Sequence, residues 1–103
     1  METRYPTDEE LEKIAKWDYN DVPALMEFVH DLWEFKEFGW RQDGEIYILA
    51  TAGWSGNESL IGALQENFVF WSLYWAESTR GGRHVFYRLT NENMQRWGSM
   101  NLS

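Results

Sequence analysis

The sequence predicts an α+β fold, in which two N-terminal helices pack on a small, mainly antiparallel sheet made of a β-hairpin, an inserted short helix and a second β-hairpin. Three observations predict it. The N-terminal third carries apolar residues with the period of a helix. Asp43-Gly44 and Arg80-Gly81-Gly82 each stand between runs with strand character. The 103 residues are 44% hydrophobic, which is enough for one packed core.

The first two helices have recognisable starts. Thr7 precedes three acidic residues, a capping-box pattern, and the helix it begins should run to about Trp17. A second helix is expected over about Val22 to Phe35, with Pro23 acceptable in its first turn. Its apolar residues share one half of the helical wheel, so the helix should cover the sheet with that half.

The polar half of this second helix contains Glu27 and His30. Glu-x-x-His is the spacing by which di-metal helical bundles place two ligands on one face. Such a site needs further carboxylates and a second Glu-x-x-His, which the chain lacks, so a solvated face is favoured and no metal or cofactor is expected. Glu27, Asp31 and Glu34 should be exposed.

The stretch from Glu45 to Asn57 organises the rest of the chain. Both faces of its strand are apolar, which predicts a central position in the sheet, and Asp43-Gly44 predicts a type I′ turn to the preceding strand. A short helix should follow from about Asn57 to Glu66. Ser55 or Asn57 could cap its start, and Asn67 could close it in the left-handed conformation.

The run from Phe68 to Trp75 allows two interpretations. Continued as a helix, it places its large side chains on one stripe. Its aromatic and β-branched content and the preceding Asn67 favour instead a strand that pairs with Val85 to Leu89. In that case the Arg80–Gly82 turn and the glycine turn after the central strand lie at the same end of the sheet. A continuous helix would place them at opposite ends.

The C-terminal residues hold one more short helical pattern. Met94 and Trp97 are three residues apart, and Gly98 is expected to stop the helix. We therefore expect a single domain over residues 1–98 and a frayed tail over residues 99–103.

Charge is unevenly distributed along the chain. Residues 1–46 hold 13 of the 17 acidic residues and 5 of the 9 Lys and Arg residues, so they account for the whole net charge of −8. An acidic surface repels phosphates, so direct nucleic-acid binding is not expected. The chain has no cysteine and no apolar run that approaches a membrane span, so a soluble cytoplasmic protein without membrane contact is expected.

The glycine turns suggest three kinds of chemistry. Gly53-Trp54-Ser55-Gly56-Asn57 resembles the Gly-x-Ser-x-Gly nucleophile elbow only in part, and a P-loop is excluded because no Gly-Lys-Ser/Thr is present. Backbone N–H groups that glycine leaves accessible at a helix start can instead bind an anion without catalysis. An arginine from the second turn would then pair with the negative charge of the anion. The predicted ligand-binding residues are Trp54, Ser55, Gly56, Asn57, Trp75, Arg80, Gly81, Gly82, Arg83 and His84.

The same residues carry a resemblance. The spacing of the Trp54-Ser-Gly-Asn57 motif and the Arg80-Gly-Gly82 motif resembles a pattern in small uncharacterised proteins encoded by bacteriophages and prophages. The resemblance covers roughly the second half of the chain. It implies a phage-like source and no particular activity.

The sequence therefore favours a non-enzymatic binding module. Its expected ligand is a small anionic or nucleotide-like group, or a peptide carboxylate, at the two glycine turns. The alternative is an acidic interaction factor, or a DNA mimic, that engages a basic protein through the N-terminal helices. A third interpretation assigns the glycines only to the turns and the tryptophans only to the core. A homo-oligomer is compatible with all three.

Overall fold

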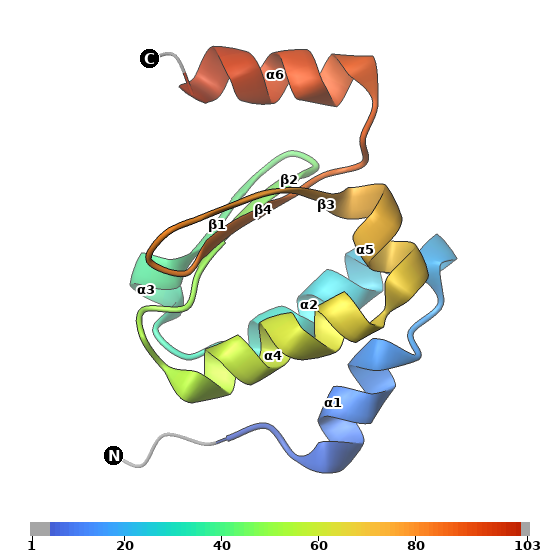
Figure 1. Ribbon diagram of the computed structural model, residues 1–103, viewed down its shortest axis with the longest axis vertical. Coiled ribbons are helices and arrows are strands. Elements are labelled where there is room, and N and C mark those ends of the chain that lie inside the picture. The colour runs from blue at the N-terminus through green and yellow to red at the C-terminus, as the bar shows by residue number, and fades with distance from the viewer. Residues whose placement is uncertain (1–4, 102–103) are drawn as a thin grey trace.

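The computed structural model describes residues 5–101 and has the predicted α+β architecture. A four-stranded antiparallel sheet lies between α6 on one face and a layer of α2, α4 and α5 on the other, with α1 packed against α4 (Figure 1). The elements are α1 (Asp8–Ala15), a 3₁₀ turn (Tyr19–Asp21), α2 (Val22–Leu32), α3 (Lys36–Gly39), β1 (Trp40–Asp43), β2 (Ile46–Ala50), α4 (Ser55–Glu66), α5 (Phe68–Tyr74), β3 (Trp75–Thr79), β4 (Arg83–Phe86) and α6 (Asn91–Asn101).

The sheet has the order β1-β2-β4-β3, so β2 is central, as predicted. The first hairpin pairs Asp43 with Ile46, which leaves Gly44 and Glu45 as the loop. Gly44 has φ +61° and Glu45 is not among the residues with positive φ, which is the sign pattern of a type II′ turn. The type I′ prediction is therefore wrong, because it took Asp43 rather than Gly44 as the first loop residue.

Successive side chains of each strand point to opposite faces of the sheet, and each face has its own core. The larger core joins the sheet to α2, α4 and α5, and its buried members include Leu25, Met26, Leu49, Leu60, Leu64, Phe70 and Phe86. The smaller core joins the sheet to α6 through Ile46, Val85, Tyr87 and Trp97. Trp40 and Tyr47 pack against the larger core, so both lie on the α2 side of the sheet.

The first helix begins with the predicted capping box at Thr7 but ends at Ala15 rather than Trp17. The second helix also ends early, at Leu32 instead of Phe35. The cause is the side chain of Asn57, which accepts a hydrogen bond from the Glu34 backbone N–H and donates one to the Glu34 carbonyl. These bonds hold Glu34 against α4 and draw the chain out of the helix.

The start of α4 differs from the prediction. Trp54 is its N-cap and has no side-chain capping bond, and the helix begins at Ser55 rather than Asn57. Neither Ser55 nor Asn57 caps it. Asn67 has φ −77°, so it does not close the helix in the left-handed conformation. Its side-chain oxygen instead accepts a hydrogen bond from the Phe70 N–H and caps the next helix, α5.

The favoured interpretation of residues 68–75 is therefore wrong for most of the run, since residues 68–74 are helical. The Asn67 side chain also donates to the carbonyls of Ile14 and Trp17, which anchors the break between α4 and α5. The strand begins only at Trp75, and the second hairpin then forms with its turn at residues 80–82, as predicted.

The last helix continues through Gly98 to Asn101, so Gly98 does not stop it, and residues 99–101 are helical. Trp97 holds α6 to the sheet, since its indole N–H donates a hydrogen bond of 2.6 Å to Glu77. Leu102 and Ser103, the rest of the predicted tail, lie outside the described residues. Within residues 5–101 no helix has the length and apolar character that a bilayer crossing requires.

Candidate functional site

The two glycine turns lie at the same end of the sheet, as expected for a second hairpin, although its first strand begins only at Trp75 rather than near Phe68. The Thr51 N–H donates a hydrogen bond of 3.0 Å to the Gly82 carbonyl, and the neighbouring Ala50 pairs with Arg83. Gly82 has φ +87°, and a Cβ atom there would overlap the Thr51 hydroxyl. The close approach of the turns therefore requires glycine at this position.

The side chains of Ser55 and Asn57 in the first turn have partners within the protein, whereas the buried indole nitrogen of Trp54 has no hydrogen-bond partner. The Ser55 hydroxyl is 2.7 Å from the hydroxyl of Tyr5, whose ring lies 4.6 Å from that of Trp54. The Trp54 indole nitrogen would be 2.6 Å from a Cβ atom at Gly56, so it covers the start of α4. Asn57 is fully buried and occupied by its bonds to backbone groups. Little of the predicted helix-start site is left open.

Most side chains of the second hairpin are also engaged. The guanidinium of Arg83 lies over the Trp97 ring, 5.3 Å from its centre, on the α6 side of the sheet. Trp75 pairs with Phe86 and lies at the other end of the hairpin from the turn. Arg80 and Gly81 are exposed at the turn itself. The structure thus brings Gly82 of this turn against Thr51, leaves Arg80 and Gly81 exposed beside it, and places Trp75 away from them.

Ser78 and His84 form a hydroxyl–imidazole pair that the sequence did not indicate. The Ser78 oxygen is 2.7 Å from Nδ1 of His84 and accepts a hydrogen bond of 2.8 Å from the Trp75 indole. Burial lowers the pKa of His84, which favours a neutral imidazole. Among the described residues no carboxylate contacts His84, so the pair lacks the group that orients the base in a catalytic triad.

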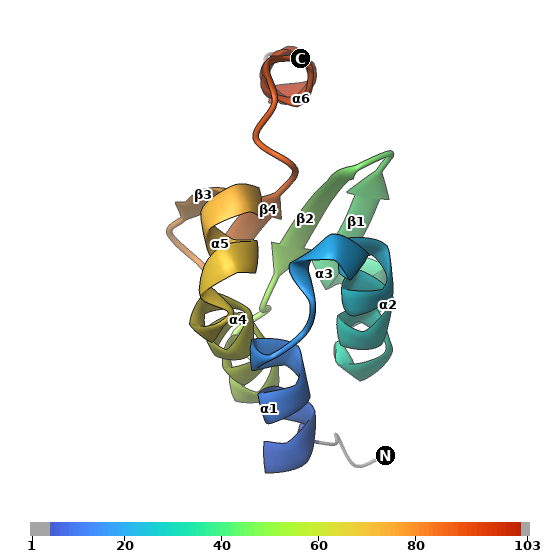
Figure 2. The same ribbon diagram turned by 90° about the vertical axis from the view of Figure 1, so that its right-hand side faces the viewer.

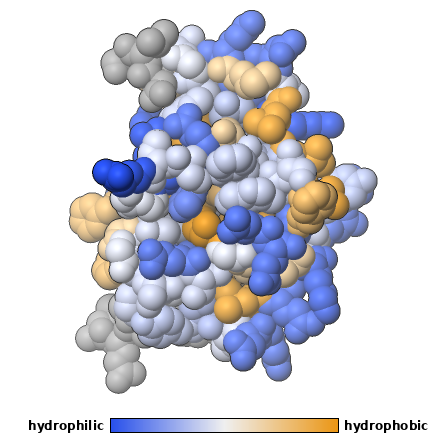
Figure 3. Space-filling view, in the orientation of Figure 1, coloured by the Kyte–Doolittle hydropathy of each residue, from blue (hydrophilic) through white to orange (hydrophobic). Residues whose placement is uncertain are grey.

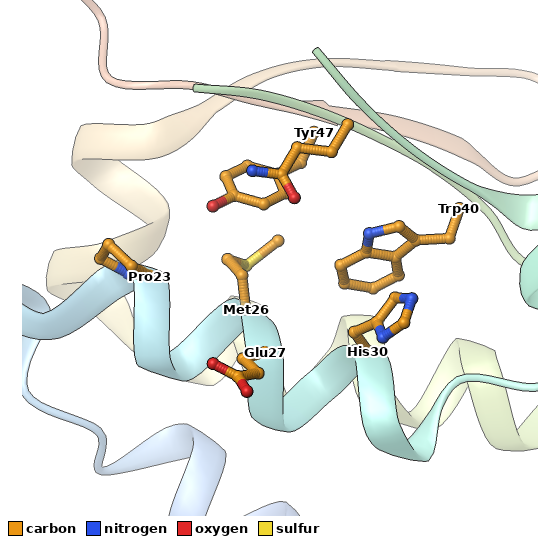
Figure 4. Close-up of a pocket in the computed structure, with 7 residues that line it drawn as sticks. Pro23, Met26, Glu27, His30, Trp40 and Tyr47 are labelled. Atoms are coloured by element: carbon orange, nitrogen blue, oxygen red, sulfur yellow. The ribbon is translucent and has the colours of Figure 1, made fainter. Parts of the chain in front are cut away.

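A cavity of about 390 Å³ lies elsewhere, between α2 and the β1–β2 hairpin. We call it the aromatic groove. It is lined by Pro23, Met26, Glu27 and His30 of α2, Trp40 and Gln42 of β1, and Tyr47 of β2. Figure 4 shows the Trp40 and Tyr47 rings extending from the strands towards α2, with Met26 rising from the helix between them.

The rings of the groove are held nearly perpendicular to one another. The Trp40 and Tyr47 rings are 6.4 Å apart at 75°, and the His30 ring meets Trp40 edge-on at 4.9 Å and 77°. Behind them, the buried Trp33 contacts Trp40 at 5.5 Å. Met26 is almost completely buried and provides the floor of the cavity. The aromatic walls are thus preorganised by the core, and Trp40 and Tyr47 also line the cavity.

The charged groups of the groove are not neutralised by neighbours. Glu27 is exposed and forms no ion pair with any residue in the range 5–101. A second cavity of about 290 Å³ continues the groove past Tyr47 and adds Glu45, Tyr74 and Arg88. Burial raises the pKa of Tyr47, with smaller contributions from the Glu45 charge and from Tyr74, so the Tyr47 hydroxyl stays protonated.

The Glu27–His30 pair therefore lies in a cavity rather than on a plain solvated face. His30 has Asp31 at 4.0 Å as its nearest carboxylate partner. No cluster of three or more His, Asp or Glu side chains suited to a metal ion occurs in the described part of the chain. The pair is better placed to line a pocket for an organic ligand than to hold a metal.

The groove was missed by sequence reasoning because its walls come from three separate elements. Trp40 and Tyr47 are brought to one face by the hairpin register, which pairs Trp40 with Leu49 and Gln42 with Tyr47. The available signal was the strand alternation, which predicts that residues 40, 42 and 47 share a face for the expected turn as well as for the observed one.

Comparisons with protein-family models, with curated proteins and with solved structures found no match for this chain. The assignment of function therefore depends on the chemistry of the described residues.

Proposed function

We propose that the protein is a non-enzymatic binding module that holds an organic cation, an alkylammonium or guanidinium group, in the aromatic groove. The observation that carries the proposal is the pair of perpendicular rings, Trp40 and Tyr47, facing α2 across the Met26 side chain (Figure 4). Aromatic faces at such angles surround a cation on more than one side, and each favourable contact contributes roughly 0.5–2 kcal/mol.

Electrostatics support the same ligand class. Glu27 lines the groove with a carboxylate that has no ion-pair partner among residues 5–101, so a bound cation would supply one. The net charge of −8 raises the concentration of cations near the surface. The volume of about 390 Å³ falls within the roughly 300–1,000 Å³ of small-molecule sites.

The continuation of the groove adds a constraint on the ligand. Arg88 lines the adjoining cavity beyond Tyr47, whereas Glu27 lines only the first cavity. A ligand with a cationic group near Glu27 and an acceptor group near Arg88 would satisfy both charges. Amino-acid-like and peptide-like cations have this arrangement.

The test is titration with choline and with its uncharged isostere, in which carbon replaces the quaternary nitrogen, followed by NMR. We expect choline to shift the Trp40 and Tyr47 signals saturably, and the isostere to bind about tenfold more weakly because it lacks the cation–π term. Equal binding of the two compounds, or no saturable shift with choline, N-acetylarginine amide or N-acetyllysine amide, would contradict the proposal.

Two substitutions localise the binding. Glu27→Gln should weaken choline binding about threefold to tenfold, whereas Glu66→Gln, a change at an exposed acid on α4, should leave it unchanged. Tyr47→Leu should abolish saturable binding because it removes one wall. Circular dichroism of each variant shows whether the fold is retained.

A second candidate function is engagement of a basic protein by the acidic helices. Its support is the exposure of Asp8, Glu9 and Glu12 on α1 and of Asp31 on α2, in the half of the chain that carries the net charge. Competition with duplex DNA for a set of basic DNA-binding proteins tests it. The DNA-mimic interpretation fails if no such protein is displaced from DNA at low salt, where charge attraction is strongest.

A further inference from the structure

Arg88 is an exposed cation that lies between two cavities. Its guanidinium forms no ion pair or hydrogen bond with any residue in the range 5–101. Arg88 lines the cavity that continues the aromatic groove, and it also lines a separate cavity of about 120 Å³. This smaller cavity, which we call the arginine pocket, is lined by Tyr19, Asn20, Leu73, Tyr74 and Arg88. All of its side chains except that of Leu73 can donate a hydrogen bond.

The backbone fixes the position of Arg88 in this pocket. The Tyr87 N–H donates a hydrogen bond of 2.9 Å to the Tyr74 carbonyl, and the Leu89 N–H donates one of 3.2 Å to the Leu73 carbonyl. Both carbonyls belong to the end of α5. Arg88 stands between these two bonds, so the chain that leaves β4 holds it against the last turn of that helix.

The other walls of the pocket are also held in place. The Tyr74 ring stacks on the fully buried Phe70, with the ring centres 5.4 Å apart and the planes at 6°. Tyr19 and Asn20 belong to the 3₁₀ turn, in which the Asp18 side chain accepts a hydrogen bond of 2.8 Å from the Asn20 N–H. Figure 2, like Figure 1, shows the blue segment between α1 and α2, which contains this turn, beside α5.

The donors of the pocket remain available after folding. In the part of the chain that the structure describes, the hydroxyls of Tyr19 and Tyr74 have no hydrogen-bond partner. Glu45, the acid that lines the adjoining cavity, does not pair with Arg88, because its carboxylate accepts a hydrogen bond of 3.4 Å from Asn93. The arginine pocket therefore presents one positive charge and several free donors to a ligand.

We propose that the arginine pocket binds a carboxylate, with the Arg88 guanidinium and the Tyr74 hydroxyl as its main donors. The planar fork of a guanidinium matches the two oxygens of a carboxylate and can bind both at once. A phosphate dianion fits less well, because the net charge of −8 and the nearby Glu45 repel a double charge more strongly than a single one.

The ligand that carries the carboxylate is a small molecule. The volume of about 120 Å³ accommodates a carboxylate and the atoms next to it. On the face of the molecule that Figure 3 shows, hydrophobic side chains form small separate groups among hydrophilic ones, rather than one broad apolar surface. Polar contacts within the pocket are therefore the main source of affinity.

The carboxylate site does not depend on the proposed cation site. Glu27 lines the first cavity of the aromatic groove and is not part of the arginine pocket, and Arg88 does not line the first cavity. A small carboxylate can bind at Arg88 with no cation in the groove. Each proposal can thus fail without the other.

The experiment is an NMR titration at constant ionic strength with N-acetylglycine and with N-acetylglycine amide, in which an uncharged amide replaces the carboxylate. We expect N-acetylglycine to shift the Arg88 Nε–H signal and the Tyr74 ring signals saturably. The amide should bind at least tenfold more weakly, because it cannot accept the two guanidinium bonds as an anion. Inorganic phosphate should bind more weakly than N-acetylglycine.

Variants of the two main donors localise the carboxylate. Arg88→Gln should abolish the saturable shifts, and Arg88→Lys should weaken binding about threefold to tenfold, because an ammonium keeps the charge without the fork. Tyr74→Phe keeps the ring on Phe70 and removes the hydroxyl, so binding should weaken about threefold. Circular dichroism of each variant shows whether the fold is retained.

Two further variants serve as controls. Arg80→Gln makes the same change at an exposed arginine of the β3–β4 turn, at the other end of the hairpin, and should leave N-acetylglycine binding unchanged. Glu27→Gln should not weaken it either, although the same variant weakens choline binding if the cation proposal is correct.

The proposal is overturned by the absence of saturable shifts with N-acetylglycine, by equal binding of the acid and its amide, or by tighter binding of phosphate. It is also overturned if Arg88→Gln binds N-acetylglycine as the unmodified protein does. Loss of binding in Arg80→Gln would place the carboxylate at the glycine turns, and loss in Glu27→Gln would place it in the aromatic groove, so either result contradicts the assignment to the arginine pocket.

Discussion

The glycine-turn end and the aromatic groove differ in how their polar groups are satisfied. At the glycine turns, Ser55 contacts Tyr5, Asn57 holds the backbone of Glu34, and Arg83 lies over Trp97. In the groove, Glu27 lines an open cavity without an ion-pair partner among residues 5–101, and Trp40 and Tyr47 line the same cavity.

The difference shows why polar residues beside glycine are a weak sign of a ligand. A glycine turn needs nearby donors and acceptors to satisfy its own backbone, and the fold uses Asn57 and Thr51 for this purpose. A ligand requires groups that remain available after the chain has folded. The groove has such groups, so it is the better candidate, although its residues form no motif.

The largest expected effect concerns Asn57. Asn57→Ala would leave the part-buried Glu34 N–H and carbonyl without this partner, and the Thr51 carbonyl with only the Trp54 N–H as donor. Each unsatisfied group costs about 1–3 kcal/mol, with partial relief from water, so we expect a loss of about 3 kcal/mol in the free energy of unfolding by urea. Asn20→Ala, at an exposed asparagine, should change it by less than about 0.5 kcal/mol.

If Asn57→Ala were as stable as the Asn20 control, the amide would be dispensable for folding. Asn57 would then be free for a ligand, and the contrast between the two regions would be lost.

The anion prediction at the glycine turns gives the next largest effect. Arg80 is exposed at the second turn, on the same end of the sheet as the start of α4. If phosphate, nucleotides or acidic peptides bind there, Arg80→Ala should weaken binding by about 1.5–3 kcal/mol, the contribution of a hydrogen bond to a charged group. Calorimetric titration measures it, and Glu27→Gln serves as a control outside the turns. Absence of binding by the unmodified protein would exclude the anion site.

The two neighbouring glycines of the second turn should differ in their tolerance of a side chain. Gly81 and Gly82 both have positive φ, but a Cβ atom at Gly81 would meet open space, whereas one at Gly82 would overlap the Thr51 hydroxyl. We expect Gly81→Ala to cost about 1 kcal/mol from strain alone and Gly82→Ala about 2 kcal/mol or more. Equal urea midpoints for the two variants would show that the turns can separate.

Much of the fold could be predicted because the signals are local. Thr7 and the acids after it mark a helix start, and both hairpin turns contain glycine at a position with positive φ. The run after Asn67 was misassigned because asparagine serves two opposite purposes. Asn67 ends α4 and also caps α5. The side-chain bonds that fix this arrangement, to Phe70, Ile14 and Trp17, depend on the folded structure.

The candidate site was harder to predict for a related reason. The Glu27–His30 spacing was visible, but the rings that complete the groove lie on β1 and β2. The expected turn pairs Trp40 with Tyr47 where the structure pairs Trp40 with Leu49, but both registers leave the two rings on the same face of the sheet. The position of the groove therefore depends on tertiary packing of α2 against the hairpin, which no single stretch of sequence encodes.

The smallest expected effect is a pH dependence from His84. Burial lowers the pKa of His84 in the folded protein below its ordinary value of about 6.5. As the pH falls below about 6.5, the unfolded chain therefore takes up a proton that the folded imidazole still refuses, and stability decreases until the folded pKa is also passed. The stability contribution of the neutral His84 is fully present above pH 6.5.

His84→Gln removes this titration, so between pH 7.5 and 5.5 the melting temperature of the variant should fall less than that of the unmodified protein. His30→Gln, at the other histidine, keeps the His84 contribution and controls for the carboxylates that titrate in all three proteins. If His84→Gln and the unmodified protein lost equal stability over this range, His84 would be hydrated enough to accept a proton freely. The Ser78–His84 pair would then be an open surface contact, and the glycine-turn end would be less tightly closed than the groove comparison assumes.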